Sequence, residues 1–279
     1  MSGITSFRLI PLVLPALFVV FCSARLYAQE PPEDSVALVR AASWNELHSS
    51  NAGHPVRFRL RKQDEEGSTT KDIIETREGD IARLVAVNDK PLTPERAAAE
   101  RERLDNLLAH PELQARRHKR EQEDSNRSNE MVRLLPDAFL YTYRGIVSTP
   151  DGPAWRLSFV PNENFIPPDR EAQVYHGMAG ELWIDCEQKR MARLDAHLIS
   201  DVNFGWGVIG RLYKGGTILV IQQDVGERHW EAIHLKLNLT GKILMVHSIT
   251  FQTTEDGSNY KPVSPGLTYK DAIHVLQSE

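Results

Sequence analysis

The segment FGWGVIGRL, residues 204–212, decides between two folds because it contains the spacing G-x-G-x-x-G. In a dinucleotide-binding fold, this spacing ends a strand and opens a helix whose N-terminus holds the pyrophosphate. Here only residues 211–214 separate the motif from Gly215 and Gly216, and another strand-like run follows. Without a helix there is neither a dipole for the phosphate nor a parallel crossover. The sequence therefore predicts that this motif is a coincidence of spacing and that no cofactor binds there.

Alternation within the same segment predicts a strand in a curved sheet. Successive side chains of a strand point to opposite faces, and glycines in a strand let the sheet bend or let another group approach the backbone. The expected apolar face carries Val202, Phe204, Trp206 and Val208, and the opposite face carries Gly205 and Gly207.

Strand-like runs on both sides of this segment predict a mainly β (α+β) fold. Phe139 to Tyr143 and Trp155 to Phe159 alternate around a turn at residues 149–152, which indicates an antiparallel hairpin. The other expected strands are 56–61, 73–77, 81–87, 180–186, 191–199, 217–225, 229–239 and 242–253, the last two joined by a turn at Thr240-Gly241. Such short connections make neighbours antiparallel, so we expect one large meander with helices inserted between its early and late strands.

Three segments favour helix. Residues 35–49 have modest amphipathicity, and Thr93-Pro94-Glu95 is typical of a capped helix start. Residues 112–130 are dense in mixed charge, which favours a solvated helix or a disordered excursion. We expect a helical, charged insertion over about residues 93–135.

The N-terminus has the pattern of a secretory signal peptide. Arg8 precedes an apolar run over residues 9–21, and small residues suit cleavage after Ala24 or Ala28. Cys22 is a poor match to a lipoprotein anchor site, because the bulky Phe21 precedes it where such a site has a small side chain. We therefore expect a signal peptide over 1–28, one domain over 29–279, and a periplasmic location.

The mature chain is acidic and has one cysteine. Cleavage after Ala28 removes Arg8 and Arg25, leaving 31 basic and 38 acidic residues and a net charge of −7. This balance excludes nucleic acid as an expected partner. Cys186 alone excludes an intramolecular disulfide, so the fold depends on its core.

No arrangement of residues predicts catalysis or a metal. His229 and His234 are five apart, which places them on opposite faces of a strand, unlike a helical zinc motif. Cys186 with His176 or His197 would be a nucleophilic site, but Cys186 shares a face with Leu182 and Ile184 and is expected to be a buried hydrophobe. We expect no enzyme, no cofactor and no metal.

Several segments of the late strands together carry a family resemblance: Gly180-Glu181-Leu182-Trp183-Ile184-Asp185, Met191-Ala192-Arg193-Leu194, residues 201–212, Lys214-Gly215-Gly216 and Trp230. In these segments the chain resembles the LolA-like periplasmic proteins, a family of LolA-, LolB- and RseB-type lipoprotein- and lipid-binding domains. The resemblance covers roughly residues 136–253 and is closest to a group of exported bacterial proteins with the same glycine-rich segment.

The resemblance implies an incomplete antiparallel barrel whose concave face is covered by helices and encloses an apolar cavity. Its expected function is to shelter lipid or lipoprotein acyl chains, as in outer-membrane lipoprotein sorting. The candidate lining is Trp155, Phe159, Trp183, Phe204 and Trp206. Aromatic strand residues also commonly fill a core. The alternative function is an envelope sensory or regulatory module that binds another protein through residues 112–130.

Overall fold

The structure is a computed structural model that describes residues 32, 34–49, 53–205, 209–243 and 247–278. The chain divides into two units, Met1–Glu30 and Pro31–Glu279, and the described residues all belong to the second. The predicted signal peptide therefore lies outside the described residues. Within these ranges, none of the helices combines the length and the apolar character that crossing a membrane requires.

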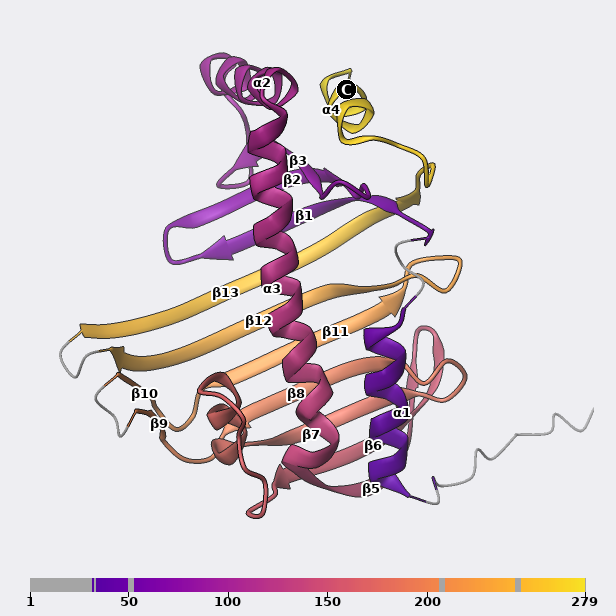
Figure 1. Ribbon diagram of the computed structural model, residues 1–279, viewed down its shortest axis with the longest axis vertical. Helices are drawn as coiled ribbons and strands as arrows, with labels where there is room; N and C mark the ends of the chain where they lie inside the picture. The colour runs from indigo at the N-terminus through magenta and orange to yellow at the C-terminus, as the bar shows by residue number, and fades with distance from the viewer. Residues whose placement is uncertain (1–31, 33, 50–52, 206–208, 244–246, 279) are drawn as a thin grey trace, which may run out of the picture. The chain divides into compact units, whose positions relative to one another are not determined.

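Thirteen strands in the described ranges form one antiparallel sheet (Figure 1). The strands are β1 (Val56–Asp64), β2 (Gly67–Ile74), β3 (Ile81–Val87), β4 (Lys90–Pro91), β5 (Phe139–Thr149), β6 (Gly152–Pro161), β7 (Met178–Asp185), β8 (Met191–Leu198), β9 (Val202–Phe204), β10 (Gly210–Leu212), β11 (Thr217–Asp224), β12 (Trp230–Ile243) and β13 (His247–Pro262). Their order is β4-β3-β2-β1-β13-β12-β11-β8-β7-β6-β5, with β10 paired to β12 and β9 to β10. The sheet is open, since β4 and β5 are its two ends.

Helices cover one face of the sheet. Helix α1 (Ser35–Leu47) lies beside the long helix α3 (Pro111–Ala138), and both cross the strands on the same side (Figure 1). Helices α2 (Pro94–Ala109) and α4 (Tyr269–Gln277) pack near β3, and the short 3-10 helix η2 (Glu171–Gly177) contacts β9. The predicted fold class, a curved open antiparallel sheet with helices on its concave face, is confirmed.

The described residues form two separate hydrophobic cores. The first lies between β5–β8, α1, η2 and the C-terminal end of α3, and its most buried side chains include Phe139, Leu157, Leu182, Ile184 and Leu198. The second lies between the β2–β3 region, α2 and α4, and it contains Ile74, Ile81, Leu104, Leu107, Tyr269, Ile273 and Leu276. Strands β11–β13 and β1 connect the two cores.

Helix α3 contacts both cores, and near its N-terminus Leu113 packs against the second one. At its N-terminal end, Gln114 Nε2 donates to the Glu78 carbonyl over 2.9 Å. Gly79 has a φ of 99°, and a side chain at this position would collide with Glu121 of α3. At the other end, Leu135 and Ala138 are buried in the first core. The helix therefore spans the distance between the cores.

The glycine-rich segment differs from the prediction of one continuous strand. Strand β9 ends at Phe204, Gly205 has a φ of 57°, and β10 returns antiparallel, with Gly210 paired to Phe204. A positive φ is readily adopted by glycine, so the segment reverses direction there. Strands β10 and β11 follow without an intervening helix, which confirms that the motif does not open a dinucleotide-binding helix.

The predicted turn at Thr240-Gly241 is wrong. Both residues lie inside β12, where Gly241 pairs with Ile249, and the pairing continues to Ile243 and His247. A Cβ at Gly241 would lie 2.2 Å from the Arg211 carbonyl oxygen. This glycine therefore permits the close approach of β10 to β12, which is a tertiary requirement.

Other expectations are corrected in part. Strand β2 begins at Gly67, earlier than predicted. Residues 112–130 lie in α3, as the helix alternative predicted, and α3 extends beyond Pro136. The sheet is not a simple meander, because β1 pairs with the last strand, β13. Helix α4 was not predicted. Thr268 and Asp271 form a capping box at its start, a local signal that would have revealed it.

Candidate functional site

The helix-facing side of the sheet carries a run of apolar side chains from β11 to β13. Directly paired residues of antiparallel strands share a face. Buried Ala196 of β8 pairs with Ile218, which pairs with Leu237, which pairs with Thr253. The residues that continue this face, named here the apolar floor, are Ile218, Val220, Leu235, Leu237, Leu239, Ile243, Ile249 and Phe251.

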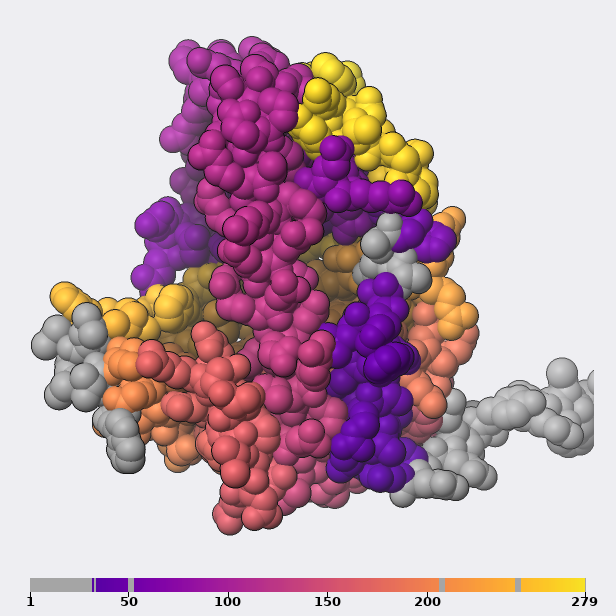
Figure 2. Space-filling model, viewed as in Figure 1, coloured from indigo at the N-terminus to yellow at the C-terminus, as the bar shows by residue number. Residues whose placement is uncertain are grey.

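The apolar floor is only partly buried by the protein itself, with Ile218 and Leu239 packed against the first core. All of its side chains keep partial or full exposure, reaching 41% for Ile243 and 48% for Phe251. The reason lies in α3, whose residues 122–128 are exposed on every side of the helix. Figure 2 shows recesses on both sides of the middle of α3, with atoms of the orange and yellow strands at their base. The helix therefore spans the floor without packing onto it.

One end of the apolar floor opens into a hollow of about 380 Å³. This size is within the range of small-molecule sites. Its apolar lining is Phe204, Ile209, Leu212, Ile243, Ile249 and Phe251, and its charged lining is Arg170, Glu171, Arg211 and Lys242. The hollow therefore combines apolar walls with an excess of positive charge.

The five aromatic residues singled out by the sequence lie in different places. Trp155 and Phe159 are packed in the first core, with 9% and 2% of their surface exposed. Trp183 lies on the opposite face from Leu182, under the guanidinium of Arg193. Phe204 lines the hollow, and Trp206 lies outside the described residues. Of the four that the structure describes, only Phe204 lines this hollow.

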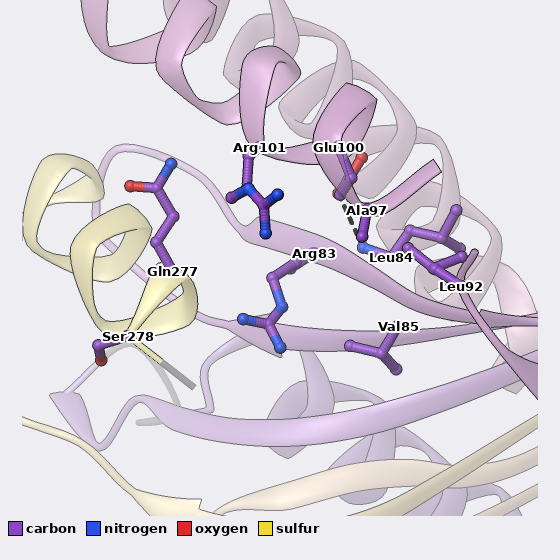
Figure 3. A pocket seen from close by; sticks show the side chains of 9 residues that line it. All are labelled: Arg83, Leu84, Val85, Leu92, Ala97, Glu100, Arg101, Gln277 and Ser278. Carbon is purple, nitrogen blue, oxygen red and sulfur yellow. Dashed lines mark hydrogen bonds between the residues drawn. The ribbon is translucent and has the colours of Figure 1, made fainter. Parts of the chain in front are cut away.

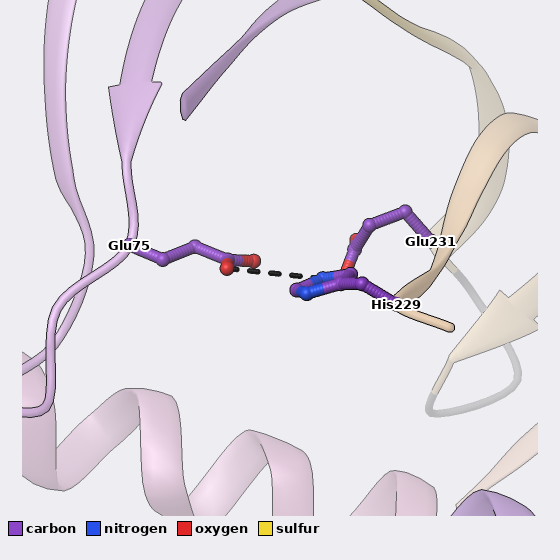
Figure 4. A group of neighbouring side chains, drawn as sticks. All are labelled: Glu75, His229 and Glu231. Atoms are coloured by element: carbon purple, nitrogen blue, oxygen red, sulfur yellow. Dashed lines mark hydrogen bonds and ion pairs between the residues drawn. The ribbon is translucent and has the colours of Figure 1, made fainter. Parts of the chain in front are cut away.

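A polar cluster joins Glu75 to His229 and Glu231, which are two residues apart from each other and distant from Glu75 in the chain (Figure 4). This His229 cluster has the His229 Nε2 atom 2.7 Å from Glu231 Oε1 and 3.8 Å from Glu75 Oε2. On its other side, His229 Nδ1 lies 2.6 Å from the carbonyl oxygen of His54. Glu75 Oε2 also accepts from the backbone N–H of Val56 over 2.9 Å.

Charges at the His229 cluster act strongly on one another. Burial raises the pKa of Glu75 to about 7. Burial alone would lower the pKa of His229, but its hydrogen bond to Glu231 and the charge of Glu75 raise it. Glu75, His229 and Glu231 could together hold a metal ion, because imidazole and carboxylate are both common metal ligands.

Sequence reasoning set His229 aside because of its spacing from His234. The structure places His234 with Asp256, 2.7 Å away on the outer face, whereas His229 meets Glu231, two residues along the chain, and Glu75 from a distant segment. Nothing in the sequence indicated that Glu75 would lie near His229. Glu75 follows the last residue of β2. The alternation of Leu235, Leu237 and Leu239 was a usable signal for the apolar floor.

No family model matches the chain, and no curated protein matches it. Two solved structures are similar to it. One is an outer membrane lipoprotein-sorting protein domain from Vibrio parahaemolyticus, with 8% identity and a TM-score of 0.28, covering 86% of this chain and 97% of that one. The other is a DUF1329 family protein from Desulfovibrio piger, with 11% identity and a TM-score of 0.27, covering 86% and 98%. Functional inference rests on the geometry of this chain, because likeness at this level says nothing of binding.

A more polar hollow of about 390 Å³ lies between β3, α2 and α4 (Figure 3). Its charged groups already stabilise the second core. Glu100 Oε1 accepts from the Leu84 backbone N–H over 2.8 Å, and Arg83 donates to the Leu276 carbonyl at the end of α4. We regard this hollow as a structural junction.

Cys186 is buried, as predicted, with 7% of its surface exposed. Burial and the neighbouring Asp185 carboxylate raise the pKa of its thiol to about 11. At pH 8 roughly one thiol in a thousand is then ionised, against about one in four for an ordinary cysteine. We expect alkylation by iodoacetamide to be at least about 100-fold slower in the folded protein than in urea, as measured by mass spectrometry. Rapid labelling of the folded protein would contradict this account.

Proposed function

We propose that this chain is a non-catalytic binding protein of the bacterial envelope that shelters the acyl chains of lipids or lipoproteins. The observation that carries the proposal is the apolar floor, a contiguous apolar face left open beneath α3. Exposed apolar patches of this kind mark binding sites in soluble proteins. An acyl chain lying on the floor would remove it from water.

The size of the hydrophobic effect sets the length of chain that binds. Each methylene moved from water to an apolar site contributes about 0.8 kcal/mol, so sixteen contribute about 13 kcal/mol. Association costs about 4 to 15 kcal/mol in lost freedom. Eight methylenes contribute only about 6 kcal/mol, so a sixteen-carbon chain is expected to bind far more tightly than an eight-carbon chain. Arg170, Arg211 and Lys242 outnumber Glu171 in the lining of the hollow, which favours an anionic head group.

Binding of fluorescent sixteen-carbon fatty acid tests the proposal. Phe251→Asp places a charge on the floor at a half-exposed position, so the fold tolerates it. The expected result is affinity about tenfold weaker, which corresponds to about 1.4 kcal/mol. The matched control is Val160→Asp, because Val160 is 50% exposed and pairs with Leu140, itself exposed, on the face opposite Phe139.

The control variant is expected to bind as the unchanged protein does. Equal loss in both variants, or no binding of either chain length by the unchanged protein, would contradict acyl binding. If the unchanged protein binds neither chain length, the protein-binding alternative is favoured, because residues 122–128 of α3 present charged and polar side chains on all sides. Export to the periplasm, with cleavage after Ala24 or Ala28, completes the proposal.

A further inference from the structure

The orientation of His229 leaves one ring nitrogen directed at carboxylates. The carbonyl oxygen of His54 only accepts hydrogen bonds, so His229 Nδ1, 2.6 Å away, carries a proton and donates it. The remaining nitrogen, Nε2, faces Glu231 at 2.7 Å and Glu75 at 3.8 Å. The His229 side chain has no exposed surface, and both glutamates are about one fifth exposed.

This orientation is that of a metal-ligating histidine. Such a residue donates its second N–H to a backbone carbonyl or a carboxylate, which fixes the ring and directs the other nitrogen at the ion. Glu75 is fixed in the same way by the Val56 N–H. The ring and one of the two carboxylates are therefore already positioned by the backbone.

We propose that Glu75, His229 and Glu231 bind one divalent transition-metal ion. The three ligand atoms lie within 4.8 Å of one another. In a tetrahedral site with bonds of about 2.1 Å, ligand atoms are about 3.4 Å apart. The separation of His229 Nε2 from Glu75 is close to this value, and the Glu231 side chain has only to retract slightly. One imidazole and two carboxylates suit Zn²⁺ or Mn²⁺ better than Ca²⁺ or Mg²⁺, which prefer oxygen ligands alone.

The ion would act as a brace for the curved sheet. Glu75 follows β2 and Glu231 lies on β12, and the sheet order places β1 and β13 between these strands. Their side chains meet because the chain leaves β2 and the sheet curves.

Metal titration of the tag-free, chelator-treated mature chain tests the proposal. We expect one Zn²⁺ per chain by mass spectrometry of the native protein. At a free Zn²⁺ concentration one hundred times the Kd, the thermal midpoint should rise by about 5 °C or more. Co²⁺ in its place should give the visible absorption of a tetrahedral site. If the unchanged protein binds no metal, His229 is a simple ion-pair partner and the proposal fails.

Variants locate the ion. Glu231→Gln and Glu75→Gln keep side-chain size and partial exposure, and each should weaken Zn²⁺ binding at least tenfold. His234→Gln is the control, because His234 has the same 2.7 Å contact with a carboxylate on the outer face. It should bind Zn²⁺ as the unchanged protein does. An undiminished Zn²⁺ shift in both glutamine variants would place the ion elsewhere and overturn the proposal.

Discussion

Replacing Glu46 by alanine is expected to lower the free energy of unfolding by about 3 to 5 kcal/mol. The Glu46 carboxylate on α1 accepts two hydrogen bonds from Arg190, at 3.0 and 2.9 Å, and a third from the Met191 backbone N–H at 2.8 Å. The side chains of this pair are only 11% and 8% exposed. Removing the carboxylate leaves a buried guanidinium and a backbone N–H without this partner, which is why the loss is large. Urea unfolding followed by circular dichroism measures it.

The control for this prediction lies on the same helix. Arg40 of α1 pairs with Asp137 of α3 at 3.1 Å, but these side chains are 62% and 68% exposed. Because water screens such a pair, Arg40→Ala should cost less than about 1 kcal/mol. If the two variants lose similar amounts, burial does not decide the strength of the contacts that hold α1.

Replacing Ile273 by alanine is expected to cost about 2 to 5 kcal/mol and to act locally. Ile273 of α4 is fully buried in the second core, against a cluster that includes Leu104 and Ile81. The lost methyl groups leave a cavity between α2, α4 and β3. Hydrogen exchange should accelerate in these elements while β5–β8 of the first core stay protected, because the two clusters are separate.

The local character of this effect tests the division into two cores. Ile166→Ala is the control, since Ile166 is 86% exposed and its truncation should change neither stability nor exchange. Faster exchange throughout β5–β8 in Ile273→Ala would show that the clusters unfold as one. A loosened second core should also release the N-terminal end of α3, so acyl binding would change with it.

Features set by neighbours in the chain were predictable. The hairpin of β5 and β6 follows from its turn residues and alternation, and its register pairs Thr149 with Gly152 as expected. Helix α2 begins at Pro94 after its Thr93 cap. Cys186 was recognised as a buried hydrophobe because its face of the strand is apolar. In each case the deciding interactions lie within a few residues.

Features set by distant contacts were not predictable. Gly241 was taken for a turn residue because a glycine between apolar runs is typical of a turn, and nothing nearby in the sequence indicates that β10 approaches it. Glu75 and His229 meet through the curvature of the sheet. Trp155 and Phe204 show equivalent strand alternation, yet Trp155 is buried inside the first core, whereas Phe204 is only partly buried against it and lines the hollow.

The sequence by itself determined most of the strands, the capped start of α2 and which side chains of a strand share a face, because these depend on local periodicity and capping. Only the tertiary structure decided that the face of β11–β13 stays open. Helix α3 is held at its two ends by separate cores, so its middle cannot descend onto the strands. The apolar floor is therefore exposed because α3 bridges the distance between the two cores, and not because of any residue in the floor itself.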